Sequence, residues 1–348
     1  MPVQGGARAQ APPPPPTTPA SSGSSRTRIW IAVGFAIAIL IATATTATVM
    51  LWKPLQSTGT TASVAAAGTP STAAAAATTV ITTVPVVAAA KTTLPASGAY
   101  LPAPAGGKTV AVSAADLMRW SGKGKEKAKV AGGGLDITLK PGGYGSTGGI
   151  VLRSQLAQGA KEILVSFEVK FGSGPTFDFV RGGKASILGF EFGSGGSSGG
   201  AWSATAGSCR LMFRARGVPC AYVYYGKTGN DLKSMADQDP SYAKVAKATG
   251  TAGHDLWDIP ATQLPPFRAN TWHTVRLYGK MNSKGKGDGA VGMSVDGQSR
   301  LFSKMRWLDS PAGVSDLLAN VWYGGSDASW SPKKDQVISF RNMKVTYA

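Results

Sequence analysis

Cysteine, histidine and acidic residues are scarce in this sequence, and each shortage excludes a class of protein. The 348 residues include two cysteines and two histidines. Two cysteines exclude a small disulfide-rich scaffold, and two histidines exclude a zinc site built from several imidazoles. Residues 1–115 contain no Asp or Glu, and the first carboxylate is Asp116. The 45 glycines and 22 prolines argue against a helical bundle.

Lysine and arginine, by contrast, are abundant. The chain has 36 of them against 18 acidic residues, which gives a formal net charge of +18. Six cations precede Asp116, so residues 116–348 alone carry a net charge of +12. These six are Arg8, Arg26, Arg28, Lys53, Lys91 and Lys108. A strongly basic surface attracts nucleic acid, anionic lipid or anionic polysaccharide, so the charge informs about partners rather than fold.

The amino-terminal third contains a candidate membrane anchor. Residues 1–28 are rich in Pro, Ser and Ala and are predicted to be a disordered tail. Residues 29–52 are 24 mostly apolar residues without a charge, long enough to cross a hydrocarbon core of about 30 Å as a helix. Trp30 and Trp52 stand at its two ends, where interfacial aromatic residues belong. A cleaved signal peptide or a buried helix is the alternative, but a signal peptide has a shorter apolar region, which favours an uncleaved anchor.

The flanking cations predict the orientation of this anchor. Arg8, Arg26 and Arg28 precede the apolar stretch, and only Lys53 follows it closely. Because positive residues collect on the cytoplasmic side, the amino terminus is predicted to be cytoplasmic and the rest of the chain extracytoplasmic, on a cell surface, in a secretory lumen or on a virion envelope. This is a single-pass type II arrangement. Residues 53–107, rich in Thr, Ala and Pro, are predicted to form a stalk.

From residue 108 onward the sequence consists of short runs in which apolar and polar residues alternate, and glycines separate the runs. Period-2 alternation with β-branched and aromatic residues predicts antiparallel strands. Residues 108–348 are therefore expected to form one all-β domain, a β-jelly roll or two-sheet antiparallel sandwich. Residues 227–266 are polar and weakly periodic, and are expected to leave the sheet, with a short helix near 240–248. The runs lie at 162–171, 185–192, 209–215, 221–225, 271–281, 289–297, 318–324 and 336–348.

Two of these runs form a predicted hairpin that gathers polar side chains. Alternation places Ser208 with Arg210 on one face of the first strand, and Tyr222 with Tyr224 on one face of the second. If Arg210 pairs near Tyr222, all four side chains project from the same surface. The same register points Cys209 and Cys220 to opposite faces, so no disulfide between them is expected.

Several motifs follow one another in this part of the chain: VRGGK at 180–184, SCRLMFR at 208–214, YVY at 222–224, WHTV at 272–275, VWYGGSDASWSPKKD at 321–335, and Phe340. Taken in this order, they resemble polysaccharide lyase family 14, which includes alginate and glucuronan lyases. The similarity covers about residues 160–348. The sequence departs from the family at 185–187, which are Ala-Ser-Ile where Leu-Pro-Gly is usual, and at Phe213, where Trp is commoner.

The resemblance implies a β-jelly roll whose concave face binds a uronic-acid polymer and cleaves it by β-elimination. The matching positions imply that Lys184, Ser208, Arg210, Tyr222 and Tyr224 are functional residues. Arg214, Trp322 and Trp330 are further candidates for binding substrate, although both tryptophans could equally be core residues. No metal or cofactor is expected.

These residue types suit the chemistry of β-elimination. The proton on C5 of a uronate is weakly acidic, and a cation beside the adjacent carboxylate stabilises the intermediate that forms when it leaves. Arg210 and Lys184 are expected to supply that cation. Tyr222 or Tyr224 is expected to be the base and to return a proton to the leaving oxygen, with its pKa lowered by the nearby cations. Ser208 is expected to orient substrate or a neighbouring side chain.

Two other interpretations of the residues stay open at this point. The paired tyrosines could be ordinary sheet residues and Arg210 a structural ion-pair partner. The chain could then be a non-catalytic protein that binds or attaches to anionic carbohydrate. Nucleic-acid binding is not expected, because the sequence contains no basic helix, ribonucleoprotein motif or zinc module.

Overall fold

The computed structural model describes residues 100–226, 232–250 and 252–348. The predicted tail at 1–28, the predicted anchor at 29–52 and most of the predicted stalk at 53–107 lie outside these residues. None of the helices in the described ranges is both long and apolar enough to cross a bilayer. Leu101 is buried beside Tyr278 and Ala290, so the packed chain extends upstream of residue 108, where the domain was expected to begin.

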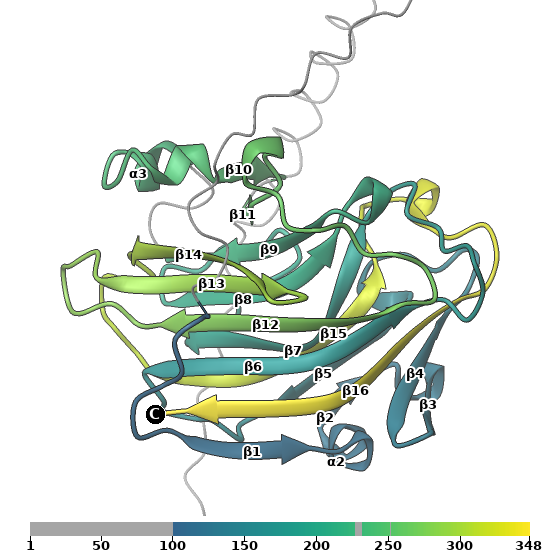
Figure 1. The fold of residues 1–348 in the computed structure, drawn as a ribbon. Coiled ribbons are helices and arrows are strands. Elements are labelled where there is room, and N and C mark those ends of the chain that lie inside the picture. The colour runs from purple at the N-terminus through teal and green to yellow at the C-terminus, as the bar shows by residue number, and fades with distance from the viewer. Residues whose placement is uncertain (1–99, 227–231, 251) are drawn as a thin grey trace, which may run out of the picture. The chain divides into compact units, whose positions relative to one another are not determined.

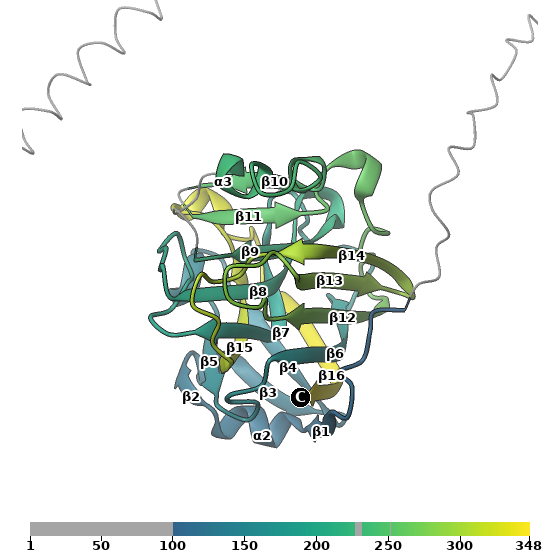
Figure 2. The same cartoon turned by 90° about the vertical axis from the view of Figure 1, so that its left-hand side faces the viewer.

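The described residues form two antiparallel eight-stranded sheets that lie face to face (Figures 1 and 2). The first sheet has the order β14-β13-β12-β6-β16-β4-β3, and β1 also pairs with β16. Its strands are β1 (Lys108–Val112), β3 (Ala128–Ala131), β4 (Gly134–Leu139), β6 (Glu162–Phe171), β12 (Trp272–Lys280), β13 (Gly289–Val295), β14 (Gln298–Met305) and β16 (Gln336–Tyr347).

The second sheet has the order β10-β11-β9-β8-β7-β15-β5-β2. The predicted two-sheet antiparallel sandwich is confirmed, and every alternating run named above contributes to a strand. The strands are β2 (Ser121–Lys123), β5 (Ile150–Ser154), β7 (Gly183–Gly193), β8 (Ala206–Phe213), β9 (Pro219–Tyr224), β10 (Ala246–Thr249), β11 (Gly253–Leu256) and β15 (Val314–Tyr323).

Helical structure in the described ranges is confined to short elements. The α-helices are α2 (Ala114–Arg119) and α3 (Leu232–Ala236), and single 3-10 turns occur at η2 (Lys125–Lys127), η3 (Gly145–Thr147), η4 (Ala215–Gly217), η5 (Tyr242–Lys244), η6 (Pro260–Thr262) and η7 (Ala328–Trp330). Helix α2 begins with a capping box in which Ser113 and Asp116 each bond the other's backbone N–H.

The expectation that residues 227–266 leave the sheet is wrong for part of that segment. Strands β10 and β11 extend the second sheet, and β11 pairs with β9. The helix expected near 240–248 is a single turn, η5. All four residues of β11 are buried, so their backbone groups need hydrogen-bond partners. The neighbouring strands β9 and β10 supply these partners, although the sequence of β11 is polar.

Burial differs between the outer faces of the two sheets. In β6 buried and half-buried residues alternate, as in a strand with one face on the core. In β8 and β9 every residue is buried, so both faces of these strands are covered. One face packs against the first sheet through residues such as Cys209 and Val223. The opposite, outer face carries the polar side chains of the predicted hairpin.

An aromatic cluster fills one end of the core. The ring of Phe171 lies 4.8–5.4 Å, centroid to centroid, from the four rings of Phe177, Phe179, Phe213 and Phe267. Such pairs stabilise a core beyond the area that they bury. Phe213 belongs to β8, so this cluster supports the strand that carries the polar hairpin from the core side.

We predict that Phe171→Ala lowers the free energy of unfolding by about 3–5 kcal/mol, because a fully buried ring is replaced by a cavity. Val130→Ala is the control, since Val130 is 52% exposed and its truncation should change stability by no more than about 0.5 kcal/mol. Urea denaturation of both variants measures the difference. Equal effects would contradict the central place given to this cluster.

Candidate active site

A cavity of about 730 Å³ crosses the outer face of the second sheet. Seven of the eight strands each contribute one residue to its wall, so the cavity runs across the strands rather than along them. These are Thr249 of β10, Tyr222 of β9, Met212 of β8, Lys184 of β7, Trp322 of β15, Val151 of β5 and Lys123 of β2. Loop residues 145–146, 198–200, 250 and 324–326, together with Arg214 and Trp330, complete the wall. We call this cavity the groove.

The register of the β8–β9 hairpin is the predicted one. Arg210 lies opposite Tyr222, and Ser208 lies opposite Tyr224. All four side chains therefore share the outer face. Cys209 packs in the core between the sheets and Cys220 packs on the outer face, so the predicted opposite orientation of the two cysteines is confirmed. Both are free thiols.

The predicted site residues separate into two depths. Lys184, Arg214, Tyr222, Trp322 and Trp330 line the groove. The other three, Ser208, Arg210 and Tyr224, are 0% exposed, do not line the groove and bond the loop that carries Ser197 and Gly200. Only the first five side chains are therefore open to contact with a molecule in the groove.

Lys184 is the best-buried cation in the wall of the groove, at 3% exposure. Its Nζ lies 4.6 Å from the centroid of the Trp322 ring and 5.4 Å from that of Tyr222. Burial, together with the positive charges of Arg210 and Arg214, lowers the pKa of Lys184 well below its ordinary value. A lysine in such surroundings holds its amine neutral at a lower pH than an exposed one.

The glycine pair that precedes Lys184 is required by close packing. A Cβ on Gly183 would lie 2.5 Å from the carbonyl oxygen of Trp322 and 2.7 Å from the ring of Phe213. Only glycine lets β7 pass this close to both neighbours. The motif thus brings β7 against β15 and β8 and points Lys184 into the groove.

The two tyrosines form a hydrogen-bonded pair in which only one reaches the groove. The hydroxyl oxygens of Tyr222 and Tyr224 are 3.0 Å apart, and the backbone N–H of Gly200 donates to Tyr224 Oη at 2.9 Å. A Cβ on Gly253 would lie 2.0 Å from Tyr222 Oη, so that glycine leaves the space that the phenol occupies. Tyr222 lines the groove, whereas Tyr224 is fully buried and does not line it.

The expectation that nearby cations lower the pKa of these tyrosines is wrong for Tyr222. Burial and the neighbouring Tyr224 hydroxyl raise the pKa of Tyr222 above its ordinary value. Desolvation outweighs the attraction of the cations because the phenolate would be cut off from water. Tyr222 is therefore protonated at neutral pH and is suited to donate a proton rather than to accept one.

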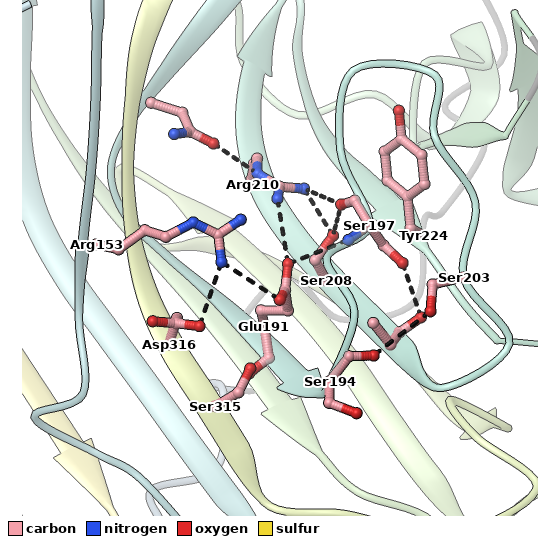
Figure 3. Close-up of polar contacts among 12 residues, drawn as sticks. Arg153, Glu191, Ser194, Ser197, Ser203, Ser208, Arg210, Tyr224, Ser315 and Asp316 are labelled. Atoms are coloured by element: carbon pink, nitrogen blue, oxygen red, sulfur yellow. Dashed lines mark hydrogen bonds and ion pairs between the residues drawn. The ribbon is translucent and has the colours of Figure 1, made fainter. Parts of the chain in front are cut away.

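Arg210 lies at the centre of a buried polar network (Figure 3). Its Nε donates to Asn320 Oδ1 at 2.7 Å, and its Nη1 donates to Ser208 Oγ at 2.6 Å and to the carbonyl oxygen of Ser197 at 3.0 Å. Its Nη2 lies 3.8 Å from Glu191 Oε2. Burial alone lowers the pKa of an arginine, and the carboxylate of Glu191 opposes that effect.

Glu191 also binds the loop that contains Ser197. One of its oxygens accepts from the backbone N–H of Ser197 at 3.2 Å, and the other lies 3.5 Å from Nη1 of Arg153. The pair of Glu191 and Arg210 thus holds both the N–H and the C=O of Ser197 (Figure 3). Three residues later in that loop stands Gly200, whose N–H fixes the hydroxyl of Tyr224.

The remaining predicted residues, Arg214, Trp322 and Trp330, also line the groove. Arg214 makes two hydrogen bonds of 2.6 Å to the carboxylate of Asp255. Trp330 packs on Gly325, where a Cβ would lie 1.9 Å from Cγ of the indole. Trp322 is 6% exposed and presents its ring to Lys184. Both tryptophans therefore line the groove rather than the core.

A family model, polysaccharide lyase 14, matches residues 128–343 of the sequence. The chain belongs to polysaccharide lyase family 14. It is accordingly a polysaccharide lyase, and the resemblance read from the motifs is confirmed over a range that begins earlier in the chain than the motifs do. No curated protein matches the sequence significantly.

Solved structures of alginate lyases share the fold of this family 14 lyase. Alginate lyase Aly36B matches with a TM-score of 0.55 and 21% identity, over 70% of this chain and 97% of its own. The marine PL-14 alginate lyase from Aplysia kurodai gives a TM-score of 0.54 and 22% identity, over 66% and 90%. Alginate lyase vAL-1 from Chlorella virus gives 0.54 and 21%, over 69% and 99%. At these identities the likeness shows the fold.

Sequence reasoning missed four residues on which the geometry of the candidate site depends: Glu191, Ser197, Gly200 and Asn320. One signal pointed to Glu191, which is the only charged residue in the run at 185–192. The other three stand in a glycine-rich loop and in a neighbouring strand, where nothing in the pattern sets them apart. Among the described residues, no group of three or more His, Cys, Asp or Glu is placed to hold a metal ion.

We predict that Lys184→Met makes the lyase more stable at pH 7, and that this gain shrinks as the pH rises towards 10.5. The pKa of Lys184 is depressed on folding, so between its folded value and 10.5 the unfolded chain binds more protons than the folded one. The wild type therefore regains stability with rising pH over that interval, and the methionine variant does not. Denaturant unfolding of both proteins at pH 7 and pH 10 measures this, and a difference that does not vary with pH would contradict it.

Proposed function

We propose that this family 14 lyase cleaves a uronic-acid polymer of the alginate or glucuronan type by β-elimination in the groove. One observation carries the proposal: in the wall of the groove, a buried lysine amine with a lowered pKa lies 5.4 Å from the ring centroid of a tyrosine whose pKa is raised. Membership of family 14 supports it. So does the fold shared with alginate lyases, since one of these structures is an Aly36B variant in complex with an alginate trisaccharide.

In this proposal Lys184 is the base. Its neutral amine removes the C5 proton of the uronate, and the electrons of that C–H bond form the double bond between C4 and C5. The bond from C4 to O4 breaks as the double bond forms. Lys184 was expected from the sequence to neutralise the substrate carboxylate, but a buried amine with a lowered pKa is better suited to accept a proton.

Tyr222 is the acid in the same step. Tyr222 lines the groove and its pKa is raised, so its hydroxyl stays protonated and can give its proton to the leaving O4 oxygen. The hydroxyl of Tyr224, 3.0 Å behind, can replace that proton through their hydrogen bond. The N–H of Gly200 stabilises negative charge on Tyr224 Oη and so favours transfer from Tyr224 to Tyr222.

Positive charge near the groove stabilises the intermediate. Arg210 and Arg214 both act on the position of the Lys184 amine, because both lower its pKa. The same field favours the build-up of negative charge on a uronate carboxylate held there. Arg214 lines the groove and can meet the carboxylate directly, whereas the buried Arg210 acts through its field. Ser208 orients Arg210 and does not meet the substrate.

We predict that Lys184→Met and Tyr222→Phe each lower kcat on the cleaved polymer by about 10²–10⁴-fold, the usual contribution of a positioned acid or base. Tyr224→Phe should cost less, because Tyr222 keeps its own proton. Tyr100→Phe is the control, since Tyr100 is 78% exposed and lies outside the groove.

Release of unsaturated products from alginate and from glucuronan, followed by ultraviolet absorbance, measures these rates. Wild-type protein that binds both polymers without forming such products would show a non-catalytic binding protein and refute the proposal. Circular dichroism of each variant separates a lost reaction from a lost fold.

We also propose that residues 29–52 anchor the lyase domain in a membrane with the domain on the extracytoplasmic side. The 24 uncharged residues and the cations before them support this proposal. The full-length chain, which includes residues 1–52, should remain in the membrane fraction after an alkaline carbonate wash. A chain that starts at residue 53 should be released. Equal release of both chains would refute the anchor.

A further inference from the structure

A second hollow, of about 600 Å³, adjoins the groove at the end where β8 leaves the sheet. The two share Arg214, Thr249 and Trp330 in their walls, so they form one continuous surface. We call this second hollow the basic annex. Its wall adds three cations that the groove lacks: Arg181, Arg216 and Lys247.

Positive charge exceeds negative charge in the wall of the basic annex. The two carboxylates there, Asp255 and Asp258, are both engaged. Asp255 binds Arg214 through two hydrogen bonds, and Asp258 lies 3.9 Å from Nζ of Lys247. Within the described part of the chain, Arg181 and Arg216 have no carboxylate within ion-pair distance. Two exposed guanidinium groups are thus left to meet an anion from outside.

The backbone of Arg216 is in a conformation that an arginine adopts reluctantly. Its φ is 62° and its ψ 21°, the left-handed region that favours glycine. The turn around it is fixed by hydrogen bonds from Arg216 N to Phe179 O at 2.9 Å and from Arg214 N to Val218 O at 2.7 Å. Because the side chain of Arg216 is exposed, its contacts contribute little stability to offset the cost of this backbone conformation. A strained residue whose charge faces a hollow points to binding there.

Trp330 joins the groove to the basic annex. Its indole is half-buried in the wall that both share, and the guanidinium of Arg181 lies 5.4 Å from the ring centroid. A sugar ring stacks on an aromatic face, and an arginine beside it can bind a carboxylate with two hydrogen bonds. The junction thus combines the two contacts that a uronate residue offers.

We propose that the basic annex binds the carboxylates of uronate residues that lie beyond the cleaved bond, with Arg216 and Arg181 as their partners. This inference rests on the proposed function, because it assumes that a polyuronate occupies the groove. A long chain fills the groove and reaches the basic annex, whereas a short oligosaccharide fills the groove alone. Arg216 therefore contributes to the binding of polymers and not to the chemical step.

Arg216→Gly tests the proposal because it removes the charge and relieves the backbone at once. We expect a higher melting temperature, a KM for polymer raised at least threefold and an unchanged kcat. The KM for a trisaccharide of the same uronate should stay as it is. Arg181→Gln should raise the KM for polymer without raising the melting temperature.

Asn270→Gly is the matched control. Asn270 also has a positive φ, of 52°, and is exposed, but it lines neither the groove nor the basic annex. Asparagine tolerates this region better than arginine, so its replacement should change the melting temperature little and leave both KM values unchanged. An Arg216→Gly variant that also leaves both KM values unchanged would overturn the inference.

A binding measurement separates failure of this inference from failure of the proposed function. Lys184→Met protein, with and without Arg216→Gly, is titrated with polymeric alginate and with polymeric glucuronan. Weaker binding of either polymer by the double variant supports the basic annex even where the wild type cleaves nothing. Equal binding by both proteins, with a wild type that cleaves the polymer, refutes the basic annex and leaves the lyase assignment standing.

Discussion

The buried ion pair of Glu191 and Arg210 is the interaction on which the arrangement of the site depends. Neither side chain reaches water, and together they hold the N–H and the C=O of Ser197. Removing one partner of such a pair commonly costs about 3–5 kcal/mol, because the other is left charged and buried. The loop that they fix carries Gly200, and through it the position of the Tyr224 hydroxyl.

The same pair also bears on the electrostatics of the candidate site. Arg210 lies buried against the loop that carries Ser197 and brings positive charge near Lys184 without lining the groove, whose wall is left to Lys184, Tyr222 and Trp322. Burial then acts on Lys184 and Tyr222 in opposite senses, lowering the pKa of the amine and raising that of the phenol. Burial thus favours the neutral form of both groups, the form in which an amine can accept a proton and a phenol can donate one.

The two-sheet sandwich, and the face of the hairpin on which the polar side chains lie, could both be predicted from the sequence. Both follow from the alternation of side chains between the two faces of a strand. The sequence placed Arg210 opposite Tyr222 for that reason. It could not give depth: Arg210 and Lys184 are both cations on strands, yet one lies under a loop and the other in the groove. The pKa of Tyr222 was misjudged for the same reason, since its sign depends on burial. Strand β11, with the sequence GHDL, has no pattern to predict it.

Because some of the cations are exposed and Arg210 is enclosed, dissolved salt affects them differently. Dissolved ions screen charges over about 8 Å at physiological concentration, but they do so only where water reaches. Arg181 and Arg216 are exposed, whereas Arg210 is enclosed together with Glu191. Under the proposed function, salt therefore weakens the capture of a polyanion and leaves the field at the reacting atoms nearly unchanged. A saline environment changes how much polymer the protein holds, and not how fast a bound chain is cut.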